Sequence, residues 1–226
     1  APRKVETLSR FLTSPVGRKI LMALTGLFLS LFLVAHLAGN FLIFLGRDIF
    51  NEYSHALISN PLIYVAEAGL VLLFVAHFAS GILLYRKNQL ARPTPYDMKE
   101  PAGHTSHKSL ASTTMIFSGL FLLVFVPLHL KTFKFGAYYE TAGAEPIRDL
   151  YRLVIEIFQN PLYVLFYVVA MAIVGFHLYH GVGSGFQSLG LDDRKGLLAF
   201  GRGFAVVIAG GFLVIPILLF LFGGNP

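Results

Sequence analysis

Histidine is the residue type that gives this sequence its potential chemistry. The chain contains eight histidines and no cysteine. The lack of cysteine excludes a disulfide framework, a thiolate metal cluster and a C-x-x-C-H attachment site. Ionisable groups inside a membrane are costly and usually functional. Six of them stand within long apolar stretches: His36, Glu67, His77, His129, His177 and His180. A cofactor site in this chain is therefore expected to rest on imidazole nitrogens.

The elements that must position these side chains are predicted to be membrane-spanning helices. Of the 226 residues, 55% are hydrophobic and 13% charged, and the mean hydropathy is +0.68. A soluble domain has roughly 25% charged residues. Apolar runs long enough to cross a bilayer predict five helices, at about 20–45, 61–86, 109–131, 160–186 and 203–222. We predict an all-α integral membrane protein in which residues 1–226 form one transmembrane bundle.

Local signals refine this map. The segment "IRDLYRLVIEIF" has apolar residues at helical spacing, which predicts a helix lying flat on the membrane at about 146–158. Asn-Pro pairs in "SNPLIY" and "QNPLYV" mark the starts of the second and fourth spans. The first span is not expected to be a cleaved signal, because its apolar run is about twice the length of a signal-peptide core.

The basic residues are unevenly distributed along the predicted topology. Most of the 18 lysines and arginines lie in the amino-terminal segment, the second loop and the fourth loop. The positive-inside rule therefore predicts a cytoplasmic amino terminus. This topology accounts for the net charge of +6, so lipid is an expected partner and nucleic acid is not. His104 and His107, in the proline-containing second loop, are expected to be solvated.

The depth of the histidines suggests how they pair. With about 1.5 Å of rise per residue, His77 and His180 lie roughly 13 to 18 Å from the cytoplasmic ends of their helices. His36 and His129 lie roughly 25 to 32 Å from the cytoplasmic ends of theirs. Two layers of two histidines are the arrangement that two stacked haems b need, each with one imidazole on either face. A zinc or copper site would instead need three or four ligands at one depth.

The second histidine of helix four leaves an alternative open. His177 lies close to one turn from His180, so it is either a supporting neighbour or itself the inner ligand. His180 is favoured by the depth match to His77 and by the glycine that follows it. Bulky residues and Pro127 surround His129, so its pocket must be opened by a kink or by the partner helices.

Three further charged residues are candidates for the site. Glu67, near the outer end of helix two, could accept a proton from a quinol or could be a neutral packing residue. Glu52, in "NEYSH", is the other candidate for this proton transfer. Arg152 on the flat helix could contact a haem propionate or a lipid headgroup.

Three long segments resemble one family of membrane proteins. They are "SPVGRKILMALTGLFLSLFLVAHLAGN", "NPLIYVAEAGLVLLFVAH" and "FHLYHGVGSGFQSLGL". They are similar to the cytochrome b membrane anchor of succinate dehydrogenase or fumarate reductase, of the single-polypeptide, five-helix, dihaem type. The resemblance implies that His77 and His180 hold the inner haem, and that His36 and His129 hold the outer haem. It also implies quinol chemistry near the outer haem with a glutamate at the start of helix two, to which Glu52 or Glu67 could correspond.

The same resemblance implies partners and a location. A flavoprotein and an iron-sulfur subunit would dock on the cytoplasmic side of a bacterial inner membrane, and electrons would pass through both haems to or from a quinone, with menaquinone favoured. Leu178 stands where some members have a transmembrane glutamate, so accompanying proton transfer is not implied here. The alternatives are a cytochrome b anchor of another dehydrogenase and a haem-free transporter or scaffold.

Overall fold

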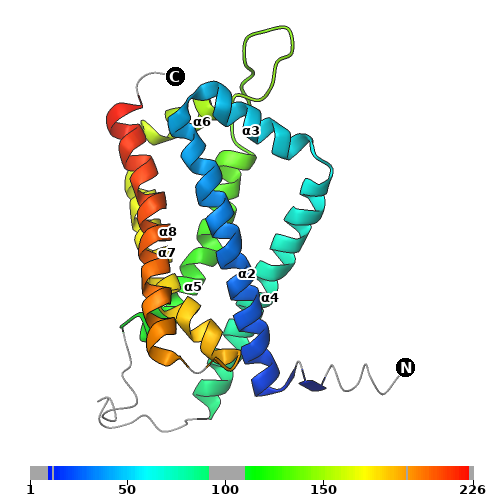
Figure 1. Cartoon of the computed structure of the whole chain (residues 1–226), viewed down its shortest axis with the longest axis vertical. Helices are drawn as coiled ribbons and strands as arrows, with labels where there is room; N and C mark the ends of the chain where they lie inside the picture. The colour runs from blue at the N-terminus through cyan, green and yellow to red at the C-terminus, as the bar shows by residue number, and fades with distance from the viewer. Residues whose placement is uncertain (1–9, 12, 92–109, 192, 224–226) are drawn as a thin grey trace.

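The computed structural model describes residues 10–91 apart from residue 12, residues 110–191 and residues 193–223 (Figure 1). His104 and His107 lie outside this part of the chain. The described residues are mainly helical, with one isolated antiparallel bridge between Glu140 and Arg148. The helical segments are α2 (Pro15–Phe41), η1 (Leu42–Leu45), α3 (Arg47–Ser59), α4 (Leu62–Leu90), α5 (Leu110–His129), η2 (Leu130–Lys134), α6 (Leu150–Phe158), α7 (Pro161–Ser188) and α8 (Arg194–Phe222).

Five of these segments are long and apolar enough to cross a membrane, which confirms the five predicted spans. They are Pro15–Leu45, Leu62–Leu90, Thr114–Lys134, Pro161–Ser188 and Lys195–Phe222. Large apolar side chains are exposed around the bundle; Tyr64, Val65 and Leu72 of α4, for example, are each about 70% exposed. A soluble monomer rarely has so extensive an apolar surface. The chain is therefore a multi-pass membrane protein.

The helix starts follow from capping residues. Asn60 and Asn160 each precede a proline, and their side-chain oxygens accept hydrogen bonds from Leu62 N at 3.0 Å and Leu162 N at 2.9 Å. These bonds satisfy amide groups that have no partner within the first turn. Both predicted Asn-Pro signals therefore mark helix starts.

Helix α3 is not predicted by hydropathy, because its sequence "RDIFNEYSHALIS" mixes charged and apolar residues. It begins after Gly46, whose φ of 112° lies in a region that favours glycine and turns the chain sharply out of η1. In Figure 1 α3 runs across one end of the bundle, near α6, and leads to the inclined helix α4.

Helices α7 and α8 lie side by side and make the most extensive helix contact. Glycine makes this approach close: a Cβ atom on Gly201 would lie 2.8 Å from the backbone N of Gly183. At mid-helix, a Cβ atom on Gly175 would lie 3.1 Å from that of Ala209. Small residues at a membrane helix interface allow such backbone contact, so α8 acts as a support for α7 and its histidines.

Candidate functional site

The outer pair of histidines comes from α2 and the end of α5. The ring centroids of His36 and His129 are 5.8 Å apart, and the two planes are nearly perpendicular at 88°. The two residues come from the first and the third membrane-spanning helices, which are not consecutive in the chain. The structure thus brings together the two histidines that the depth argument paired.

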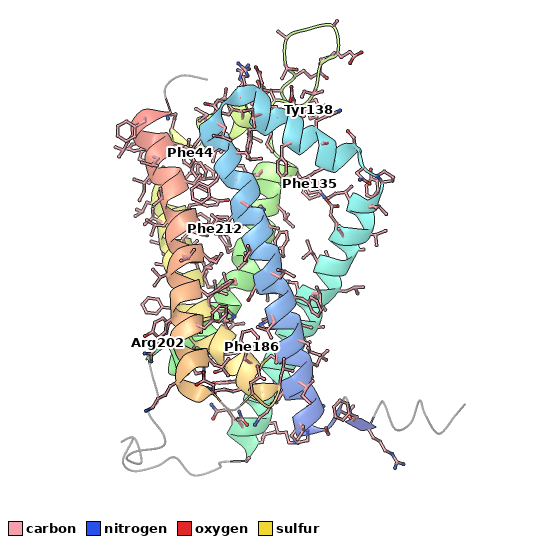
Figure 2. The ribbon with its side chains drawn as sticks, viewed as in Figure 1. Phe44, Phe135, Tyr138, Phe186, Arg202 and Phe212 are labelled. Carbon is pink, nitrogen blue, oxygen red and sulfur yellow. The ribbon has the colours of Figure 1, made fainter. Side chains whose placement is uncertain are left out.

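Aromatic rings surround this outer pair. Phe32 stacks on His36 with centroids 5.2 Å apart, and Phe212 of α8 lies 5.6 Å from the same imidazole (Figure 2). On the other side, Phe125 and Phe133 lie 5.8 and 5.4 Å from His129. The outer imidazoles are therefore held mainly by the shape of an aromatic pocket.

Tyr167 of α7 adds a polar contact to the outer pair. Its buried hydroxyl lies 3.2 Å from Nδ1 of His129. His129 itself follows Pro127, and the chain then changes from an α-helix to a π-helical turn over residues 130–134. Such turns are rare and often occur at functional sites. His129 therefore lies at the junction between the α-helix that contains Pro127 and the π-helical turn.

The inner pair consists of His77 on α4 and His177 on α7. Their ring centroids are 6.2 Å apart, with an angle of 72° between the planes. His180 makes a different contact, since its Nε2 lies 3.1 Å from the hydroxyl of Ser184 on its own helix. The structure thus places the alternative ligand, His177, beside His77. His177 and His180 are three residues apart, which is only about 4.5 Å along the helix axis. A tilt of either helix can change the relative depth of two residues by that amount.

Two hydroxyl groups lie beside the Nδ1 atoms of the inner imidazoles. With its proton donated to Met115 O at 3.0 Å, Ser118 has oxygen lone pairs free to accept from Nδ1–H of His177, also at 3.0 Å. Thr25 likewise donates to Leu21 O at 2.7 Å and lies 3.2 Å from Nδ1 of His77. The carbonyl of Met22, 3.1 Å away, is a second acceptor for the same Nδ1–H.

This arrangement leaves the Nε2 lone pair of both inner imidazoles for a metal. Metal-bound histidines usually donate their other N–H to a carbonyl or a similar acceptor, which orients the ring and increases its basicity. Nε2 of His180, in contrast, is already engaged by Ser184. The ring contact between His77 and His177, rather than His180, therefore favours His177 as the inner partner of His77.

Glycines provide the space beside the inner rings. A Cβ atom on Gly26 would lie 2.9 Å from Cε1 of His77, closer than two carbon atoms can approach without a shift. A Cβ atom on Gly119 would lie 3.8 Å from Cε1 of His177, an ordinary contact. Gly26 is therefore required for the observed position of the His77 ring.

Both pairs fit the axial positions of a haem. With metal–nitrogen bonds of about 2 Å, two imidazoles on opposite sides of one iron have ring centroids about 6 Å apart. The observed separations of 5.8 and 6.2 Å agree with this value. Among the described residues, no group of three or more His, Asp or Glu side chains is placed to hold a bare metal ion. Each pair could supply two ligands to an iron whose other four ligands come from a porphyrin.

The three charged candidates occupy different settings on the outer side. Glu67 forms an ion pair with Lys134 at the end of η2, with both side chains more than one-third exposed. Glu52 is exposed on α3. Arg152 donates from Nε to Glu156 Oε1 at 2.8 Å and lies over the ring of Tyr139, 4.2 Å from its centroid. Within the described residues none of the three contacts a histidine ring, so the structure gathers the histidines but not these charged residues.

A buried carboxylate on the outer side is a feature that the sequence did not reveal. Asp149 accepts hydrogen bonds from Arg47 and from Asn51 Nδ2, the latter at 2.8 Å, and it caps α6 through Arg152 N at 3.1 Å. Burial acts to raise the pKa of Asp149, but the hydrogen bonds from Arg47 and Asn51 outweigh it and lower the pKa below its usual value. This network joins α3 to α6.

The supporting residues Thr25, Ser118 and Tyr167 were also missed. The sequence does contain a signal for the first two, because each is a small polar residue next to a glycine within an apolar run. Which histidine each would contact depends on helix rotation, which the sequence does not fix.

Comparison with known proteins adds no relative: no family model, curated protein or solved structure matches the chain. A functional assignment therefore rests on the residues and their geometry.

Proposed function

We propose that this chain is a dihaem cytochrome b membrane anchor that passes electrons between an iron-sulfur subunit and a membrane quinone. The observation that carries the proposal is the presence of two separate histidine pairs, each drawn from two helices and each with a centroid separation near 6 Å. Proton-relay histidines of a transporter would not need this spacing twice.

Each residue has a defined task in the proposal. His36 and His129 would hold the outer haem iron, and His77 and His177 would hold the inner one. Ser118, Thr25 and Met22 O keep Nε2 of the inner imidazoles unprotonated by accepting Nδ1–H. When bound, haem supplies reversible one-electron chemistry at iron. The aromatic residues around His36 and His129 exclude water from the outer pair.

The enzyme to which the anchor would belong is a succinate:quinone oxidoreductase of a bacterial inner membrane. This part of the proposal rests on the three segments that resemble the family and on the distribution of basic residues. A flavoprotein and an iron-sulfur subunit would dock on the amino-terminal side, and menaquinone is the quinone to test first. Glu67 would be the proton-transfer candidate, because its ion pair with Lys134 keeps a carboxylate at the outer end of α4.

The direct test is a reduced-minus-oxidised absorption spectrum of the purified chain, combined with haem quantitation. We expect two haems b per chain. A colourless protein, after expression with sufficient haem supply, would refute the proposal. Copurification with a flavoprotein that oxidises succinate would support the succinate assignment, whereas copurification with a different dehydrogenase would replace it.

A further inference from the structure

An open apolar groove lies on the surface of the bundle between α7 and α8. It encloses about 230 Å³. At its floor Gly175 is half-buried and Ala205 and Ala209 are buried, whereas Ala172, Phe176 and Val206 are exposed along its edges. Because these positions repeat at helical spacing, the groove follows the two helices for about two turns.

One end of the groove carries a positive charge. Arg202 lies one turn before Ala205 on α8, and its guanidinium is 5.2 Å from the ring centroid of Tyr179, which also lines the groove. Figure 2 shows Arg202 on the outside of the bundle, near the end at which α8 begins. Within the described residues, Arg202 is in none of the salt bridges.

The position of Arg202 along α8 corresponds to a membrane interface. Residues 203–222 carry no charge, and 20 helical residues span about 30 Å, the thickness of the hydrocarbon core. Arg202 therefore lies at the headgroup level on the amino-terminal side. Tyr179 beside it is also a residue type that favours the interface. From this point the groove extends into the hydrocarbon of the same leaflet.

We propose that this groove binds one anionic phospholipid of the leaflet on the amino-terminal side. Its phosphate would pair with Arg202, and one acyl chain would lie over Gly175, Ala205 and Ala209. Basic pockets between membrane helices bind anionic headgroups in this manner. A second copy of the chain fits less well, because a two-fold axis along the membrane normal would place the Arg202 residues of both copies at the same depth. The proposal does not depend on haem binding.

The test is native mass spectrometry of the full chain in detergent, titrated with dioleoyl phosphatidylglycerol or dioleoyl phosphatidylcholine. We expect the first phosphatidylglycerol to bind about fivefold more tightly than phosphatidylcholine. Arg202→Gln should remove this preference. Lys87→Gln, which removes an exposed charge from the same end of α4, is the matched control and should retain it. Equal preference in wild type and Arg202→Gln would overturn the proposal.

A second set of variants tests the acyl-chain part. Ala172→Phe should obstruct the groove and weaken binding of both lipids, whereas Ala79→Phe, at an exposed site on α4, should not. Glycerol phosphate without acyl chains should fail to compete; effective competition would contradict a groove-bound chain. A dimer that Ala172→Phe separates would identify the face as a contact between copies and would likewise overturn the proposal. Circular dichroism confirms that each variant is folded.

Discussion

The inner and outer histidine pairs are held in place by different kinds of interaction. His77 and His177 are oriented by directional hydrogen bonds from Nδ1 to acceptors whose own protons are committed elsewhere. His36 and His129 are surrounded by phenylalanine rings, with the Tyr167 hydroxyl beside His129 and the Asn40 side-chain amide 3.4 Å from Nδ1 of His36. Hydrogen bonds to Nδ1 therefore orient the imidazole rings of the inner pair, whereas packing against aromatic side chains orients those of the outer pair.

The difference indicates how each site tolerates change. At His177, removing the Ser118 hydroxyl would leave the ring N–H without its acceptor, whereas His77 would retain Met22 O if the Thr25 hydroxyl were removed. An aromatic pocket has several walls, and replacing one of them leaves the others in contact. Single substitutions should thus have a sharper effect on the inner pair than on the outer pair.

The largest expected effect is the loss of one haem. His177→Ala should reduce the haem content from two per chain to one, whereas His180→Ala should retain both. His77→Ala together with His177→Ala should still leave one haem, since both residues serve the same site. His36→Ala together with His177→Ala should leave none. Haem quantitation on the purified variants measures this, and loss of a haem in His180→Ala alone would reverse the assignment of the inner ligand.

Substitution of Gly26 should have the next largest effect. Gly26→Val places side-chain atoms where Cε1 of His77 lies, so the imidazole must move and the inner haem should be largely lost. The outer haem should remain. Gly69→Val is the control, because nothing lies within 4 Å of a Cβ atom there. Equal haem content in Gly26→Val and Gly69→Val would show that the His77 ring is not held against α2.

Removing the hydroxyl groups compares the two sites directly. Ser118→Ala should weaken inner haem binding about 10- to 100-fold, the usual effect of losing a hydrogen bond to a metal-bound histidine. Tyr167→Phe should weaken only the outer haem, and by less, because the aromatic pocket remains. The rate of haem loss from each site is measured by transfer of the haem to an apoprotein acceptor. A larger effect from Tyr167→Phe than from Ser118→Ala would contradict the view that hydrogen bonds orient the inner imidazoles and aromatic packing orients the outer ones.

The smallest effect is expected at Asp149, which supports the outer side from a distance. Its folded-state pKa lies below that of the unfolded chain, near 3.9. The stabilisation is therefore present above about pH 4 and is lost as the pH falls through the folded-state pKa. Asp149→Asn should lower the free energy of unfolding at pH 7 by about 1 kcal/mol and remove this acid dependence. Thermal denaturation at several pH values measures it.

Asp48→Asn is the matched control for that experiment, since Asp48 is an exposed carboxylate on α3, the helix that Asp149 contacts through Arg47 and Asn51. Its thermal stability should follow the wild-type pH profile. If both variants behave alike, the network between α3 and α6 does not contribute to stability.

The sequence predicted the spans well because hydrocarbon thickness dictates the length of an apolar run. It underestimated the helix ends: α2 begins at Pro15 with a Ser14 cap, and α4 continues to Leu90 beyond the basic residues. These extensions lie outside the hydrocarbon core, where helices continue without an apolar requirement. Helix α3 escaped notice for the same reason, since its stability comes from contacts such as Asn51 with Asp149.

The sequence predicted which helices supply the paired histidines, and it located each histidine to within one helical turn. Depth correctly brings His36 to His129 in the structure, but it does not separate His177 from His180, because tilt and rotation decide which ring faces α4. The identity of the supporting hydroxyls depends on the same rotation. Contacts within one helix, such as that of Ser184 with His180, compete for the imidazole and become visible only in three dimensions.

The pairing of alternate helices has a consequence for biosynthesis. The outer pair joins α2 to α5, and the inner pair joins α4 to α7, so neither pair lies within two spans that are consecutive in the chain. A nascent chain that has left the ribosome through α5 already contains both outer ligands, whereas the inner ligands are complete only after α7. Cofactor loading is therefore expected to proceed from the outer position to the inner one, with the contact between α7 and α8 closing the assembly last.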